Sequence, residues 1–586
     1  MTTRIIFVLL LTTYACYAQN YDINSEQFSS DYLLLSAING GHLGDYTIQP
    51  VPLRKLRFDI VHYADPSNRN FGIHYPQESP ALRYEEFWKQ IDNYYKPLML
   101  QSIKNTFHDC YYTRDSVNSN HYVDNSRGSW FEPYVGLYHT FAYGDTNAAV
   151  IADVCGMARV GNVDNGTVSE SFVLGRLSAR AMGSLGEHLG FMLDLSNGLN
   201  AKGTPQIVAL SDPTLGRTLK FSIDEKKFFD RYIGYVQYES EYFRARFGRE
   251  NYAWGYSPID NLVHSRYAPL MDGLLMDAQY KGVRFTSNHS AIEGLDVNGK
   301  AVINKFVSSH RIQLDPAPWL SMAVNDMIIY SGRGLDFAYL NPLGFYVSTG
   351  LGTVQKSDED NSLIAADFAI RPIHGTLLYG SLLADDIGFS TLSATDSRGN
   401  NNKYAFQFGG SWSPVAMLLF STEYARITPF TFSHRKVNNS WTHLGAPLGY
   451  NMQPNSDRIA VQAKYWLTAR TFLQLDFDYT RWGENILDSK GNIATVVLDS
   501  GKTIIPVGNV GGNMLRGDGD FLPTPYNVRN EFLRGNVSHT RRLTAWFSTQ
   551  VYSNIFADVR AQYTNRNSGN NPMQQLWFSF EVRVGY

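Results

Sequence analysis

The residues best suited to chemistry gather between positions 244 and 272 of the 586-residue chain. Aromatic side chains alternate there with charged and hydrogen-bonding ones, and the candidates are Arg249, Tyr252, Trp254, Tyr256, Asp260 and His264. Aromatic rings offer apolar faces, while the neighbouring polar side chains supply hydrogen-bond donors and acceptors. A sugar ring uses both, so these six residues form a candidate carbohydrate-binding site. Gly248 and Gly255 keep a second interpretation open, in which the segment is a tight corner whose aromatic residues pack internally or at a membrane interface.

Further aromatic residues lie in the long polar stretch from Thr428 to Ser456, and they are Phe430, Phe432, Trp441 and Tyr450. If these rings are exposed, they could contact a polymer at the surface. If they are buried, they serve only to pack the loop. Both interpretations stay open at the level of the sequence.

The short motifs of common catalytic and metal sites are missing from the sequence. It contains no Walker-type phosphate loop, no HExxH and no Gly-x-Ser-x-Gly elbow. His264 and Ser265 could be half of a hydrolase site, but adjacent residues of a strand point to opposite faces. The acidic runs at 358–360 and 385–386 could bind calcium, although solvated loops are the simpler interpretation. We therefore expect no enzymatic activity, no cofactor and no metal.

The first eighteen residues have the features of a secretory signal peptide. A basic start at Arg4 precedes the apolar run Ile5–Leu11, and small residues follow, so cleavage is expected after Ala18. A buried first helix or lipidation at Cys16 are the alternatives. Beyond this segment we find no run of 18 apolar residues, which leaves a fold in water or a closed membrane barrel.

Composition narrows the class of protein further. A net charge of −3 provides no basic field for nucleic acid. The 37 Tyr residues and the 14% of aromatic residues suit the interfacial girdles of a barrel. Once Cys16 is removed with the signal, Cys110 and Cys155 remain, either as one disulfide or as two buried thiols.

Alternation with a period of two is clearest at the end of the chain. The apolar residues there are Leu576, Phe578, Phe580, Val582, Val584 and Tyr586, with polar or small residues between them. Such a strand presents one face to lipid and the other to a wet lumen. Its terminal aromatic residue resembles the signal that the barrel-assembly machinery reads. Residues 459–467 and 473–479 repeat the alternation as a hairpin.

Connection lengths predict the organisation of the whole chain. Short turns alternate with long polar loops, which is typical of bacterial barrels with short turns at the periplasm. We count six strands from Phe131 to Gly248 and about twelve later ones, so the sequence predicts an all-β transmembrane antiparallel barrel of about 18 strands over 128–586. By strict parity, the long pieces 199–229 and 251–276 cannot both be external loops. Either this count misses a strand, or one or both pieces fold into the lumen as plugs. Residues 19–127, with helical spacing over Ala81–Thr106, are expected to form a small periplasmic, partly helical domain that caps or plugs the barrel. A loosely ordered leader is the alternative.

Motifs spread along the chain resemble the capsule-assembly outer-membrane family called Wzi. The most specific stretch joins Phe247-Gly248-Arg249, a Trp254-Gly255 corner and Pro269, and the other matches are 132–134, 193–198, 340–343 and 383–386. The resemblance implies an eighteen-stranded barrel in the outer membrane, closed to free diffusion. It would bind capsular or exopolysaccharide and assist its assembly and attachment, with membrane lipid as its other partner. The alternative is a porin-like channel or transporter for a small solute. Because inward positions carry both signs of charge, as Arg458 and Asp476 show, we expect a mostly blocked lumen.

Overall fold

The structure is a computed structural model of the chain. It describes residues 22–23, 34, 38, 43, 48–49, 51–52, 141–144, 148–185, 188–205, 207–208, 227–240, 242–295, 301–346, 360–386, 402–415, 418–468, 471–498, 503–517, 531–552, 555–568 and 572–584.

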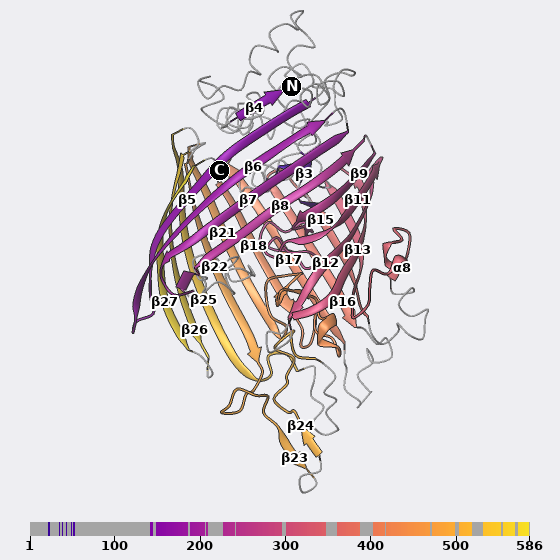
Figure 1. Cartoon of the computed structure of the whole chain (residues 1–586). Coiled ribbons are helices and arrows are strands. Elements are labelled where there is room, and N and C mark those ends of the chain that lie inside the picture. Colours follow the sequence, from indigo (N-terminus) through magenta and orange to yellow (C-terminus); the bar gives the residue numbers. More distant parts are fainter. Residues whose placement is uncertain are drawn as a thin grey trace, which may run out of the picture.

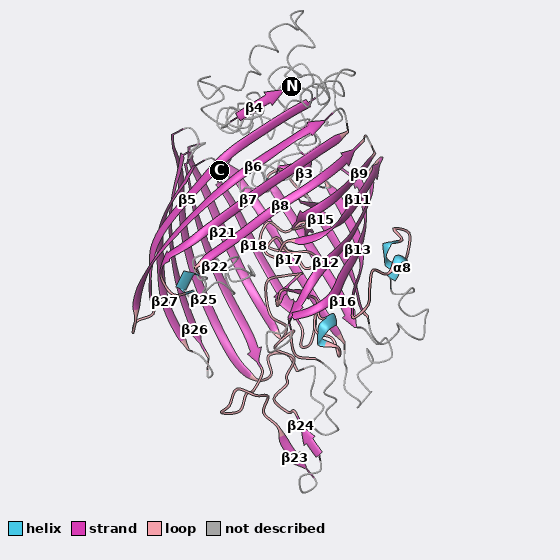
Figure 2. Ribbon diagram, in the orientation of Figure 1, coloured by secondary structure: helices cyan, strands magenta, loops and turns pink. Residues whose placement is uncertain are grey.

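Strands dominate these residues, and they close into a barrel (Figure 2). The long strands of the barrel number eighteen among the described residues, and each pairs antiparallel with the next. They are β5 (Ala148–Asp164), β6 (Ser169–Leu185), β7 (Leu189–Lys202), β8 (Phe228–Glu239), β9 (Phe243–Glu250), β11 (Met271–Tyr280), β12 (Val283–Leu295), β13 (Ala301–Ala317), β14 (Leu320–Ser331), β15 (Asn361–Ile370), β16 (Thr376–Asp386), β17 (Lys403–Val415), β18 (Leu418–Ile427), β21 (Ser456–Thr468), β22 (Thr471–Glu484), β25 (Asn536–Tyr552), β26 (Ile555–Asn567) and β27 (Met573–Val584). The last strand closes the barrel on the first, with Phe580 of β27 opposite Val160 of β5. The predicted eighteen-stranded barrel is confirmed.

One strand of the predicted count has a different role. The described part of the expected strand Phe131–Tyr143 is the short β4 (Phe141–Gly144), which pairs with Ala149–Ala152 at the start of β5. β27 pairs with the remainder of β5, from Gly156 to Asp164. The seventeen-residue β5 is long enough to hold both partners on one edge. The prediction that this strand is one of the eighteen was therefore wrong, and β5 to β9 together with thirteen later strands form the barrel.

Side chains alternate between a polar interior and an apolar exterior, as the sequence predicts. In β27, Leu576, Phe578 and Phe580 are exposed, whereas Ser579 and Glu581 between them are buried. Exposed leucines and phenylalanines in rows around a closed barrel are what a lipid environment requires. The protein is thus a barrel of the outer membrane.

Long and short connections lie at opposite ends of the barrel. Turns of two to five residues join β11–β12, β13–β14, β15–β16, β17–β18, β21–β22 and β25–β26 at the periplasmic end. Figure 1 shows the small hairpin of β23 (Val496–Leu498) and β24 (Thr503–Ile505) projecting at the external end. The segments 203–227 and 251–270 both leave from this external end, because the short turn at 240–242 returns the chain to it. The parity argument against two external pieces was wrong, because its count included the strand Phe131–Tyr143. The expected inward folding is confirmed for 251–270, as described below.

The segment before the barrel is described at a few positions. Leu34, Ile38 and Leu43 are buried, and the backbone oxygen of Ile38 accepts a hydrogen bond from Gly375 in a periplasmic turn, at 3.1 Å. β1 (Asp22–Ile23) pairs with β3 (Val51–Pro52), and β2 (Ile48–Gln49) pairs with β10 (Ala253–Trp254). The expected signal peptide, the helix over 81–106 and Cys110 lie outside the described residues, so the 19–127 domain and the disulfide stay predictions. No helix in the described parts of the chain has the length and apolar character to cross a membrane.

Candidate functional site

The connection between β9 and β11, residues 251–270, folds into the barrel as a plug. Its first residues form β10, which pairs with β2 on one side, and the Trp254 N–H donates to the His264 oxygen at 3.1 Å. Gly255 turns the chain with φ +140°, and an added Cβ there would lie 2.3 Å from the Asn261 Oδ1 atom. Only glycine fits this corner. The interpretation of Trp254-Gly255 as a tight internal corner is therefore correct.

The structure separates Arg249 from the other five candidate residues. Arg249 lies on the outer face of β9, where its guanidinium pairs with Asp272 at 2.9 Å and lies 4.5 Å from the centre of the Tyr232 ring. The other five lie inside the barrel and are at most 2% exposed, namely Tyr252, Trp254, Tyr256, Asp260 and His264. In this arrangement a glycan cannot reach their side chains. Their role in binding stays a prediction, and their observed contacts are those of a plug.

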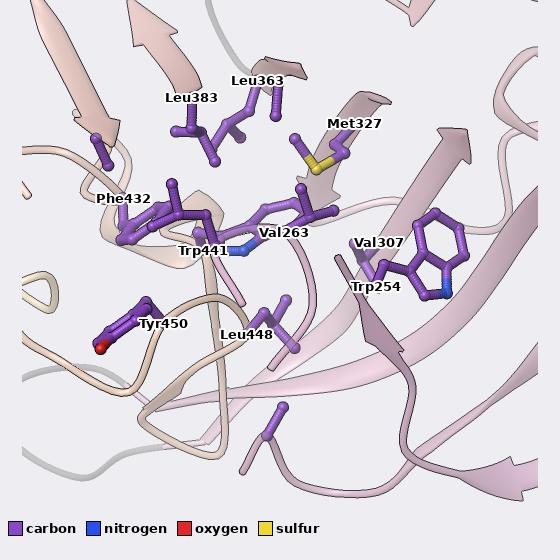
Figure 3. Packing of buried hydrophobic residues seen from close by; sticks show 14 of the residues in the cluster. Trp254, Val263, Val307, Met327, Leu363, Leu383, Phe432, Trp441, Leu448 and Tyr450 are labelled. Carbon is purple, nitrogen blue, oxygen red and sulfur yellow. The ribbon is translucent and has the colours of Figure 1, made fainter. Parts of the chain in front are cut away.

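Aromatic packing joins the plug to a second inward-folded connection, residues 428–455. The His264 ring packs against Trp254 at 4.9 Å and against Trp441 at 5.8 Å, while its Nε2 atom lies 2.9 Å from the Ser309 hydroxyl on β13. Burial lowers the pKa of His264 to about 3, so this ring is neutral. Figure 3 shows Trp441, Phe432 and Tyr450 packed with the plug and with inward side chains of the wall.

All four aromatic residues of that connection are buried, so their packing role is the one that the structure supports. The connection is also fixed to the wall by polar contacts. Lys305 donates to the Ser440 and Thr442 oxygens at 2.8 and 2.7 Å, and the Asp385 carboxylate accepts from the Phe432 N–H at 2.6 Å. The connection contains the short helix η5 (Val437–Asn439) and the hairpin of β19 (Thr442–His443) and β20 (Ala446–Pro447).

One buried carboxylate on β18, Glu423, connects the wall, the plug and the second connection. It accepts hydrogen bonds from the Tyr379 hydroxyl at 2.9 Å, the Gln407 amide at 2.6 Å, the Tyr450 hydroxyl at 2.7 Å and the Ser257 hydroxyl. Four donors from four separate segments satisfy this single charge. Sequence reasoning missed Glu423, because the only signal is a charge at an inward strand position and many residues of the barrel share it.

Asp260 provides the matching anchor from the plug side. Its carboxylate accepts from the Ser265 hydroxyl at 2.5 Å, the Asn261 N–H at 2.8 Å and the Asn451 N–H at 2.7 Å. Gln407 also donates to the Asp260 backbone oxygen at 2.5 Å, so the two anchors share a partner. Burial raises the pKa of Asp260 to about 6, against these hydrogen bonds, which favour the charged form.

Charges of both signs cross-link the rest of the lumen. Buried pairs join Arg159 to Glu581 at 2.5 Å and Arg284 to Asp277 at 2.7 Å, and further pairs are Arg246–Glu250, Arg311–Asp367, Arg458–Asp478 and Arg583–Asp558. Paired charges of mixed sign hold a lumen together and give no single field for one kind of ion. Together with the plug and the second connection, the inward side chains of β11 to β18 form a packed cluster.

The arrangement offers little for catalysis. His264 contacts Ser309, whereas the Ser265 hydroxyl donates to Asp260, so the two residues face different partners. In the described part of the chain, no three His, Cys, Asp or Glu residues are placed to hold a metal ion. Of the two acidic runs, Asp385 binds the Phe432 N–H and Asp360 binds Arg333 at 2.6 Å.

Comparison with known proteins places the fold. No family model matches the chain, and no curated protein matches its sequence. Among solved structures, the chain is similar to the Escherichia coli protein Wzi, described as an outer-membrane protein involved in group 1 capsule assembly and a carbohydrate-binding β-barrel. The identity is 12% over 97% of this chain and 99% of that one, with a TM-score of 0.54. Matches to Pseudomonas aeruginosa OprD and Acinetobacter baumannii OccAB4 have TM-scores of 0.39 and 0.43, identities of 9% and 7%, and cover 74% and 75% of this chain and 94% and 98% of theirs. The likeness to Wzi shows that the two chains share the same kind of barrel.

Proposed function

We propose that this protein binds surface polysaccharide at the outer membrane and assists the assembly and attachment of a capsule or exopolysaccharide. One observation carries the proposal. Two connections from the external end, 251–270 and 428–455, fold back and fill the barrel with buried aromatic and hydrogen-bonded side chains. A small-solute channel needs a wet path through the lumen, whereas a binder needs only its outer surface. The filled lumen therefore favours the binder.

The external surface around the second connection is where we place the polymer contact. Arg435 and Lys436 are exposed there. Arg516 is adjacent in space, because a Cβ added at its neighbour Gly517 would lie 3.0 Å from the Arg435 oxygen. Guanidinium and ammonium groups pair with the carboxylates or phosphates of an acidic glycan. The five buried candidates, from Tyr252 to His264, could join this contact only if the plug opened.

The likeness of fold agrees with the proposal. Wzi, a carbohydrate-binding barrel involved in capsule assembly, has a barrel of the same kind. The proposed partners of this chain are accordingly a surface glycan and the outer-membrane lipid around the barrel, with the barrel-assembly machinery acting during biogenesis.

The test compares polysaccharide on cells with polysaccharide in the medium. In a strain lacking the gene, we expect surface polymer to be released, and the wild-type gene should restore attachment. Arg435→Ala, Lys436→Ala and Arg516→Ala combined should restore much less at an equal membrane level. Lys490→Ala is the control, since Lys490 is an exposed basic residue outside this surface.

Two results together would replace the proposal with the channel alternative. One is unchanged surface polysaccharide in the deletion strain. The other is a steady, large single-channel current from the purified protein in planar bilayers.

A further inference from the structure

Three neighbouring strands carry a polar patch on the side of the barrel that should face lipid. Near the periplasmic end, their outward residues are apolar and exposed, as at Val283, Ile312 and Val324. Farther towards the external end a group of outward positions is polar, and this patch consists of Ser287, His289, Ser308, His310 and Asp326. Beyond the patch, the outward Phe306, Ile328 and Tyr330 pack beneath the same cover as the patch. The register confirms that they are neighbours, with Ser287 opposite His310, His289 opposite Ser308 and His310 opposite Asp326. Lipid would destabilise such groups.

The patch is nevertheless buried, because the chain after β14 folds over it. We call residues Gly332–Tyr346 the flap, and they include the short helix α8 (Phe337–Leu340). The Tyr346 N–H donates to Asp326 at 2.6 Å, and the His310 Nδ1 atom lies 3.0 Å from the Gly344 oxygen. Figure 1 shows α8 beside the outer wall, next to β13.

Aromatic packing fixes the flap in this position. The Tyr346 ring stacks on His310 at 4.2 Å, and its hydroxyl lies 2.6 Å from the His310 Nε2 atom. Tyr339 packs against Tyr330 of β14 at 5.1 Å, and both are fully buried. The Arg333 guanidinium binds both oxygens of Asp360, at 2.7 and 2.6 Å, where the chain returns to β15. The flap is therefore a folded layer on the wall.

The other side of the flap is apolar and exposed. Phe337 is 79% exposed and Leu343 is 88% exposed, and Leu335 and Phe345 are 46% and 51% exposed. Four large apolar side chains on one short external segment are unusual on a surface that faces water.

The exposed apolar side chains of the flap are explained by the height of the apolar band that a barrel presents to lipid. On β21, five outward positions two residues apart are apolar, namely Ile459, Val461, Ala463, Tyr465 and Leu467. About ten residues of a tilted strand cross the hydrocarbon, so five outward positions span it. Among the β13 side chains whose burial the structure describes, 304–317, only Ile312 and Leu314 are both apolar and exposed. The exposed apolar part of this strand therefore reaches less than half of that height. The exposed side of the flap supplies the missing apolar surface.

We infer that the flap lies in the hydrocarbon of the outer leaflet, with Phe337 and Leu343 in contact with acyl chains and the polar patch sealed beneath it. This inference does not depend on the proposed polysaccharide function. It assigns a lipid-binding role to an external segment, alongside the strands that cross the membrane.

Depth-dependent quenching tests the inference. The chain is prepared with its three cysteines replaced by Ser, and Leu343→Cys or Phe337→Cys is labelled with the environment-sensitive fluorophore NBD. Val461→Cys on β21 marks the lipid band, and Val497→Cys on the projecting β23–β24 hairpin marks water. Each folded variant, identified by its heat-modifiable migration, is placed in phosphatidylcholine vesicles with or without nitroxide on the acyl chain.

We expect acyl-chain nitroxide to reduce the emission at position 343 by about as much as at position 461, while position 497 is unaffected and is quenched by aqueous iodide. The variant at 337 gives the same reading independently, in case one substitution disturbs folding. Iodide quenching at 343 and 337 without nitroxide quenching would place the flap in water and overturn the inference. Protection from both quenchers would also overturn it, because the surface would then be covered by protein such as a second copy of this chain.

Discussion

At the scale of single residues, the plug depends on a few carboxylates that several segments share. Glu423 is 2% exposed and accepts hydrogen bonds from Ser257, Tyr379, Gln407 and Tyr450. A buried charge with four donors is stable only while all of them are present. The same carboxylate therefore fixes the position of the plug and of the second connection together.

Replacing Glu423 by Ala should destabilise the protein by about 3–5 kcal/mol, because buried donors lose their acceptor. The free energy of unfolding in urea, measured in lipid vesicles, tests this. Glu423→Gln should also be costly, since an amide oxygen accepts fewer bonds and its NH₂ group faces other donors. Glu531→Ala is the control, because Glu531 lies exposed on an external connection. Equal stability of Glu423→Ala and the control would contradict the anchor role.

The sequence identified several residues of the plug but could not establish that they are buried. Trp254 and His264 were both named as candidates, and they lie in contact and are fully buried. A glycan site and a plug in a polar lumen draw on the same residues, because both need apolar rings beside hydrogen-bonding groups. The distinction depends on Trp441 and Glu423, which lie more than 150 residues further along the chain. Trp441 and Glu423 come close to the plug only because the barrel closes, and no local sequence pattern predicts which inward residues then meet.

At the scale of elements, alternation with a period of two was the most informative signal. It predicted the two faces of β21, β22 and β27 correctly, because lipid and lumen differ so strongly that each inward or outward position is specified. The outer wall beneath the flap breaks this rule. The outward residues His310 and Asp326 are polar, and only their cover of Tyr346 and Gly344 explains why.

Replacing Phe580 by Asp tests the lipid face of β27. Phe580 is 40% exposed and lies opposite Val160 and Val559. A carboxylate there should cost about 2 kcal/mol and reduce the amount of folded, heat-modifiable protein in the membrane. Gln574→Asp is the matched control, because Gln574 is exposed on the same strand near the external rim, where a charge reaches water. Normal membrane levels of the Phe580 variant would mean that this face of β27 does not contact lipid.

At the scale of the whole molecule, two external connections, 251–270 and 428–455, fold into the barrel and pack against its wall. Wall residues such as Val307, Met327 and Leu363 point inward and pack against the plug in one cluster with Trp441. This apolar packing and the buried charge pairs on other inward positions make that part of the interior resemble the core of a water-soluble protein. A core of this kind agrees with the proposed function, in which polysaccharide is bound on the external surface and nothing passes through the lumen.

The second connection, 428–455, can be removed without breaking the barrel. Ile427 and Ser456 pair directly across β18 and β21, so a two-residue Asn-Gly turn can join them. The shortened protein loses Phe432, Trp441 and Tyr450 from the core, and Lys305 loses its two backbone partners at Ser440 and Thr442. We expect an open lumen with steady single-channel currents in planar bilayers, and we expect no such currents from the wild type.

The matched control removes an external segment that projects away from the barrel. Replacing residues 496–505, the β23–β24 hairpin, by Asn-Gly deletes a segment that projects from the barrel and whose ends are also paired, with Val496 opposite Ile505. This variant should stay closed, because Val496 and Val497 of the deleted hairpin are exposed and lie outside the buried cluster. If both variants conduct equally, or if the loss of 428–455 leaves the barrel closed, the connection is not what fills the lumen. Currents from the first variant alone would show that the inward packing of this one connection keeps the lumen closed. The contacts of Glu423 and Trp441 with this connection would then determine whether the barrel conducts.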